Sequence, residues 1–63
     1  MMTNKQKLAF VILAIRASGQ DPKAQLTGYV QTGNPQYITR REGARQLVTE
    51  LPTGMLMEYT GRA

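Results

Sequence analysis

Three arginines, Arg40, Arg41 and Arg45, are the residues of this sequence best suited to bind a charged ligand. Arg41 and Arg45 are four positions apart, so on one helix their guanidinium groups would share a face and could bind phosphates or base edges together. Three interpretations stay open. The segment could read nucleic acid, it could meet acidic or phosphorylated groups of a partner protein, or Arg45 could be structural and anchor the carbonyls of the preceding turn.

The charge around these arginines favours a protein partner over nucleic acid. Residues 37–63 contain four basic and three acidic residues, whereas residues 1–36 contain four basic residues and only Asp21. The arginine-rich half is therefore almost neutral, which is a poor electrostatic match for DNA. We expect weak nucleic-acid binding, confined to low salt. A small helix-turn-helix nucleic-acid-binding protein is the alternative interpretation.

The composition argues against catalysis. The chain contains no histidine and no cysteine, which removes the usual general base and the commonest zinc ligands. Asp21 is explained as a helix cap before Pro22, and Glu42 as part of a capping box with Thr39. The glycines are isolated, so none forms a loop that could cradle a phosphate. We expect a protein that is not an enzyme and has no metal and no cofactor.

Thr3 is the candidate for a covalent modification. Thr3 and Gln6 form a capping-box pattern before the first apolar segment. A phosphate on Thr3 would place negative charge beside the free N–H groups of the helix start, which is favourable. The alternative is a plain N-cap that is never phosphorylated.

The first helix is expected around the eight apolar residues 8–15. Two apolar stripes at helical spacing make this helix apolar most of the way round, so several of its sides must be covered. Eight residues are far fewer than the about 20 needed to cross a bilayer. We therefore expect no membrane insertion and a cytoplasmic protein, with a signal peptide as the less favoured interpretation.

Local signals predict further helices along the chain. Asp21 and Pro22 start a second helix that ends at Gly33, and Gly28 inside it indicates a kink or the close approach of another backbone. Gly33, Asn34 and Pro35 predict a tight turn. A third helix is expected from the Thr39 capping box to Leu51, and a last short one after Pro52.

The length and composition predict one all-α domain that pairs with a copy of itself. Sixty-three residues with four aromatics bury only about 60% of the surface exposed on unfolding. Without cysteines such a chain gains burial most easily by association. We expect a compact bundle of four to five short helices over residues 1–63, forming a homodimer. Residues expected at the dimer or partner interface are Leu8, Val11, Ile12, Ile15, Tyr29 and Tyr37, although core packing is also open for the tyrosines.

The segment "GQDPKAQLTGYVQTGNPQYITRREGARQLV" resembles the IreB family of small regulatory phosphoproteins from Gram-positive bacteria. The likeness is strongest over residues 8–48. The motif residues, with matching order and spacing, are Gly19, Pro22, Gln25, Gly28-Tyr29-Val30, Gly33-Asn34-Pro35, Tyr37-Ile38 and Ala44-Arg45.

The resemblance implies a compact, all-helical, homodimeric and cytoplasmic protein without enzymatic activity. It also implies control by a transmembrane Ser/Thr kinase and its paired phosphatase, in the cell-envelope stress response and antibiotic tolerance, with an unknown downstream protein as partner. Two departures stand out. Family members usually carry a longer N-terminal extension that holds the phosphorylated threonines, so Thr3 is the nearby candidate here. Their last helix is usually continuous, whereas Pro52 and Gly54 interrupt this one.

Overall fold

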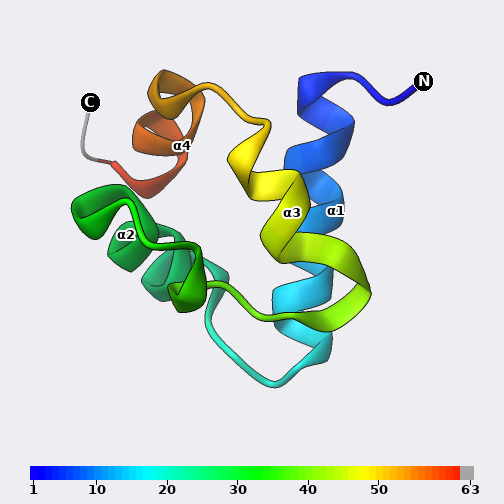
Figure 1. Ribbon diagram of the computed structural model, residues 1–63, viewed down its shortest axis with the longest axis horizontal. Coiled ribbons are helices and arrows are strands. Elements are labelled where there is room, and N and C mark those ends of the chain that lie inside the picture. The colour runs from blue at the N-terminus through cyan, green and yellow to red at the C-terminus, as the bar shows by residue number, and fades with distance from the viewer. Residues whose placement is uncertain (62–63) are drawn as a thin grey trace.

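The computed structural model describes residues 1–61, apart from the side chain of Glu42, and these residues form helices joined by tight turns (Figure 1). The four α-helices and two single-turn 3₁₀ helices are α1 (Asn4–Ala17), α2 (Pro22–Thr32), η1 (Pro35–Tyr37), η2 (Arg41–Gly43), α3 (Ala44–Thr49) and α4 (Thr53–Thr60). No strand occurs in the described part of the chain. The predicted all-α fold of four to five short helices is confirmed.

The first two helices begin where the local sequence predicts. The Thr3 hydroxyl accepts a hydrogen bond from the Gln6 N–H at 3.1 Å, and the Gln6 side chain accepts one from the Thr3 N–H at 2.8 Å, which completes the capping box of α1. Asp21 caps α2 by accepting from the Lys23 N–H at 3.1 Å, with Pro22 in the first turn. Each cap satisfies N–H groups that the helix leaves free, so these boundaries are set by neighbouring residues alone.

The third helix starts later than predicted. The Thr39 hydroxyl accepts from the Arg41 N–H at 3.3 Å and opens only the short turn η2. Gly43 then takes a left-handed conformation with φ of 75°, which ends η2 and places the start of α3 at Ala44. The Glu42 side chain, the other half of the predicted capping box, lies outside the described residues. As predicted, the helix ends before Pro52.

The helices pack as two pairs. α1 lies against α3 and α2 lies against α4, and contacts of α2 with α1 and of η1 with α3 join the pairs (Figure 1). The buried apolar core draws on all four helices and on the segments that follow η1 and α3. Its residues are Val11, Ala14, Ile15, Leu26, Ile38, Ala44, Val48, Leu51 and Leu56. None of the described helices is long and apolar enough to cross a bilayer.

A single chain buries one side of the apolar first helix, which corrects one expectation. The radius of gyration is 10.2 Å, close to the about 11 Å expected for a compact domain of this length. Val11 and Ile15 are fully buried within the chain, so neither can meet a second copy as expected. The physical reason is that α2 and α3 close over this side of α1. The opposite side stays open, with Phe10 37% and Leu13 64% exposed.

The structure corrects the expectation for Gly28. This residue makes room for the side chain of Tyr37, and it neither kinks the helix nor admits another backbone. α2 runs without interruption from Pro22 to Thr32. A Cβ atom at Gly28 would lie 2.7 Å from Cδ1 of Tyr37, which is inside van der Waals contact. The missing side chain therefore lets the Tyr37 ring pack against α2 at Gly28, and this contact holds η1 against the helix.

Adding a methyl group at Gly28 should destabilise the protein. We expect Gly28→Ala to lower the free energy of unfolding by about 1 kcal/mol, because displacing the Tyr37 ring outweighs the gain in helix propensity. Gly54→Ala is the matched control, since Gly54 lies in α4 with no atom within 4 Å of the added carbon. It should be neutral or stabilise by up to about 1 kcal/mol. Urea denaturation measures both changes.

A double mutant isolates the cause. In a Tyr37→Ala background the clash is gone, so Gly28→Ala should there become neutral or stabilising. Equal losses in both backgrounds would contradict the packing of Tyr37 on Gly28.

Candidate functional site

The turn that precedes the arginines is fixed by hydrogen bonds at three points. Gly33 ends α2 in the left-handed conformation, with φ of 70°, and its N–H donates to the Tyr29 carbonyl at 2.7 Å. The Asn34 side chain accepts from the Gln36 N–H at 2.9 Å, and Pro35 begins η1. The Thr39 N–H then donates to the Gln25 side chain on α2 at 3.0 Å. The predicted structural turn at Gly33, Asn34 and Pro35 is present as a capped 3₁₀ turn.

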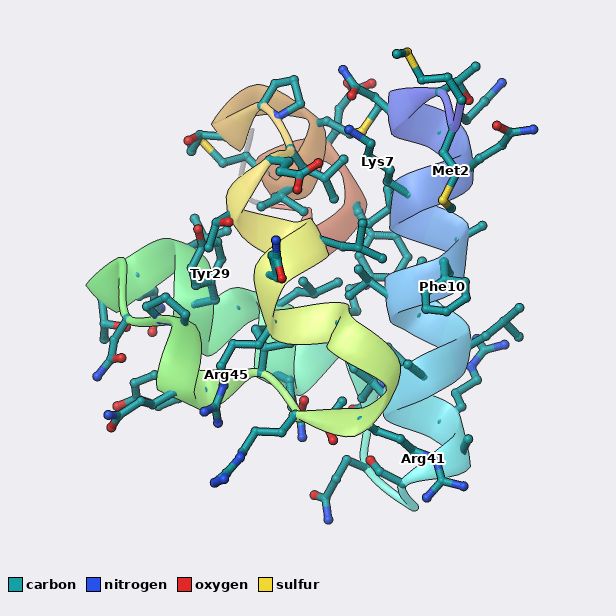
Figure 2. All side chains as sticks on the ribbon, turned by 45° about the vertical axis from the view of Figure 1, so that its right-hand side comes forward. Met2, Lys7, Phe10, Tyr29, Arg41 and Arg45 are labelled. Carbon is teal, nitrogen blue, oxygen red and sulfur yellow. The ribbon has the colours of Figure 1, made fainter. Side chains whose placement is uncertain are left out.

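Arg45 holds this turn from the other side. Its Nε donates to the Ile38 carbonyl at 3.1 Å, and a terminal nitrogen donates to the Gln36 carbonyl at 3.4 Å. The side chain reaches from α3 toward the segment that follows α2 (Figure 2). A guanidinium group suits this task because its fork presents several donors in fixed geometry. Of the two interpretations of Arg45, the structure therefore shows the contact with the turn's carbonyls.

The three arginines do not form one surface. Arg40 and Arg41 are exposed, but they lie before Gly43 and outside α3, whereas Arg45 is half-buried within it. Arg41 lies near the C-terminal end of α1, the turn that carries Arg16 (Figure 2). The expected pairing of Arg41 and Arg45 on one helical face is wrong, because the left-handed Gly43 separates them.

The helix that carries Arg45, α3, does not suit the helix-turn-helix interpretation. α3 has six residues, which at 1.5 Å per residue is only about 9 Å long. Its one arginine donates to the backbone carbonyls of Ile38 and Gln36. Weak nucleic-acid binding remains a prediction.

The open side of α1, opposite its core residues, forms a second candidate surface. We call it the outward face of α1, and it consists of Lys5, Gln6, Ala9, Phe10, Leu13, Arg16 and Ala17 of the helix and of Met2 just before it, all of them exposed. Figure 2 shows Met2 and Phe10 one above the other along the helix. The face combines large apolar side chains with two cations and contains no acidic residue.

Sequence reasoning listed the apolar stripes of α1 but did not separate the buried side from the open one. A usable signal was present. Lys5 and Arg16 are three turns apart on the same side as Leu13, and charged side chains are almost never fully buried without partners. Their side of the helix is therefore the one that faces solvent.

The N-terminal end of α1 contains the candidate modification site. Thr3 is exposed, and one turn further on the Lys7 ammonium group lies 2.9 Å from a carboxylate oxygen of Glu50. This ion pair joins α1 to the residue that follows α3. Lys7 and Glu50 are partly exposed, so the pair contributes little to stability by itself.

The remaining residues expected at an interface differ in how far they reach the surface. Leu8, Ile12 and Tyr29 are half-buried and pack against the core. Tyr37 is 49% exposed, although one side of its ring lies on Gly28. Tyr37 is thus the member of this group best placed to meet another molecule.

Comparison with known proteins identifies what this chain is similar to. The family model described as "IreB regulatory phosphoprotein" matches residues 1–61. A UPF0297 protein of Lachnoclostridium phytofermentans is 33% identical over 54 residues, which cover 86% of this chain and 61% of that protein. A UPF0297 protein of Ruminiclostridium cellulolyticum is 37% identical over 54 residues, with the same shares of 86% and 61%. The matched region spans about three fifths of the length of these relatives.

Removing the Arg45 side chain should loosen the turn. We expect Arg45→Ala to lower the free energy of unfolding by about 1–3 kcal/mol, because charge-assisted hydrogen bonds to two carbonyls are lost. Arg41→Ala is the matched control: Arg41 is exposed, so its change should stay within about 0.5 kcal/mol. Arg45→Lys should recover only part of the loss, because an ammonium group lacks the planar fork. Urea denaturation measures all three.

A loss for Arg45→Ala no larger than that for Arg41→Ala would contradict a structural role for Arg45.

Proposed function

Because this chain belongs to the IreB family of regulatory phosphoproteins, we propose that it is a small non-enzymatic regulator that acts by binding other proteins. In this proposal a Ser/Thr kinase phosphorylates it, a phosphatase reverses the modification, and the pathway serves the envelope-stress response. The observation that carries the proposal is the organisation of α1. The helix begins at an exposed threonine and presents an uncovered apolar and cationic side.

Thr3 is the proposed phosphorylation site. Its hydroxyl oxygen is at the N-cap of α1, where the Gln6 N–H already donates to it. A phosphate attached there would interact with the positive end of the helix dipole and with Lys5, which is two residues away. The modified chain would keep its first helix, so the switch would change the charge of the surface rather than the fold.

Arg40 and Arg41 are the proposed contacts for acidic or phosphorylated groups of the downstream partner. Both are exposed, and both follow a turn that is held to α2 and α3 by the hydrogen bonds of Gln25 and Arg45. A fixed turn lowers the entropy lost on binding, which favours recognition. Arg45 contributes by holding that turn rather than by contacting the partner.

We also propose that the protein works as a homodimer. Of the six residues expected at an interface, Val11 and Ile15 belong to the core, so they are not part of this proposal. Tyr37 supports it, because an exposed tyrosine provides a large, rigid contact area at low entropic cost. The surface around η1 is the proposed site of self-contact.

Phosphorylation can be tested with a substitution that spares the helix cap. Thr3→Asn removes the hydroxyl but keeps a side-chain oxygen that caps as well as threonine does. Incubated with the cell's Ser/Thr kinase and ATP, the unmodified chain should gain the mass of one phosphoryl group at Thr3, and the variant should gain none. Mass spectrometry with fragmentation locates the group. A chain that stays unmodified, or is modified only elsewhere, would contradict the assignment of Thr3.

Self-association can be tested by sedimentation equilibrium. We expect a mass of twice 7.0 kDa at micromolar concentration. Tyr37→Gln should raise the dissociation constant of the dimer by about tenfold or more, as expected for an aromatic anchor. Leu13→Gln, which changes another exposed apolar residue, should leave the dimer intact. A mass of 7.0 kDa for the unmodified chain at every concentration would contradict the homodimer.

A further inference from the structure

We propose that the outward face of α1 is a docking surface for an acidic amphipathic helix of a partner protein. The inference deepens the proposed function and rests on it, since it names the kind of protein that such a regulator would bind. Its basis is the combination of uncovered apolar side chains, two cations in a helix that contains no acidic residue, and a row of side chains suited to helix packing.

The outward face of α1 contains most of the large exposed apolar side chains among the described residues. Large exposed apolar side chains among the described residues are Met1, Met2, Phe10, Leu13 and Tyr37. Three of them, Met2, Phe10 and Leu13, belong to the outward face. Scattered exposed apolar residues are ordinary, whereas a group gathered on one helix side marks an interaction surface.

The folded chain does not cover this face. α1 contacts α3, α2 and η2, and no contact with α4 is found in the described part of the chain. The core residues Val11, Ala14 and Ile15 take up the opposite side of the helix. α1 therefore lies at an edge of the molecule, and its outward face is uncovered (Figure 1).

The charge of the helix identifies the partner as acidic. Within Asn4–Ala17 the charged residues are Lys5, Lys7 and Arg16, with no aspartate or glutamate. Lys7 is paired with Glu50, so Lys5 and Arg16 are the cations of the outward face. They lie near opposite ends of the helix, on either side of Phe10 and Leu13. A partner with an apolar centre and carboxylates toward both ends would complement this arrangement.

The same charges argue against a second copy of α1 as the occupant. If two copies packed face to face in parallel, Lys5 would meet Lys5 and Arg16 would meet Arg16. In the antiparallel arrangement Lys5 would approach Arg16 of the copy at both ends. Neither arrangement pairs these cations with a carboxylate of α1, and like charges held together at an interface are unfavourable.

The shape of the face suits a helix. α1 has 14 residues, which gives a length of about 21 Å. Along the row Ala9, Leu13 and Ala17, whose members are four residues apart, one large side chain lies between two small ones, a pattern against which the side chains of a second helix can pack. We therefore expect a partner helix of about four turns, with leucine-like residues at i, i+3, i+4 and i+7.

The test is a titration with two synthetic helical peptides that differ only in charge. Both carry leucine at i, i+3, i+4 and i+7. One has glutamates beside this stripe and the other has lysines. Backbone amide resonances of the full chain, recorded by NMR at low and at physiological salt, locate the contact. We expect the glutamate peptide to shift resonances of α1 around Phe10 and Leu13, with binding that weakens as salt increases, and the lysine peptide to bind at least about tenfold more weakly.

Two variants connect the binding to the face. Leu13→Gln should weaken binding of the glutamate peptide by about tenfold or more. Arg16→Glu should reverse the preference, so that the lysine peptide binds more tightly than the glutamate peptide. Gln31→Ala, which alters an exposed residue of α2, is the control and should bind as the unmodified chain does. Unchanged amide dispersion confirms that each variant is folded.

Four results would overturn the proposal: equal binding of the two peptides, shifts located away from α1, shifts of α1 resonances on concentrating the chain alone, or binding to vesicles of anionic lipid without binding to the glutamate peptide. The titration uses neither a kinase nor Thr3. If the titration fails, the phosphorylation of Thr3 is still decided by the kinase experiment alone.

Discussion

The packing of one side of α1 onto α2 and α3 is the interaction on which the rest of the structure depends. Val11, Ala14 and Ile15 provide the part of the core that brings the two helix pairs together. A helix that is apolar most of the way round can bury only as much surface as its neighbours cover. In this short chain α2 and α3 cover one side, so the outward face of α1 stays uncovered in the folded chain.

A second constraint decides which arginines are available. The turn after α2 must bring Ile38 into the core, and it does so with bonds from Gln25 and Arg45 and with the ring of Tyr37 lying on Gly28. Arg45 is therefore used by the fold. Arg40 and Arg41 remain exposed on the segment that this turn positions. One short stretch of sequence thus contains both an arginine that holds the fold and two arginines that are exposed to solvent.

The features that could be predicted from the sequence are those that neighbouring residues determine. The caps at Thr3, Asp21 and Asn34 and the all-α fold are of this kind, and the family resemblance was confirmed as well. Other features depend on residues far apart in the chain. The ring that lies on Gly28 comes from η1, and the burial of Ile15 depends on helices that follow it. Periodicity alone could not tell which side of α1 faces the core, and charge position was the signal that could have done so.

The central claim is that α1 is divided between a side buried in its own chain and a side left open. The most direct measurement is NMR relaxation of α1 methyl groups in the presence of a dissolved paramagnetic agent that enters neither the core nor a close interface. The account predicts strong relaxation of the Leu13 methyls and protection of those of Val11 and Ile15. Equal protection of Leu13, or strong relaxation of Ile15, would contradict it.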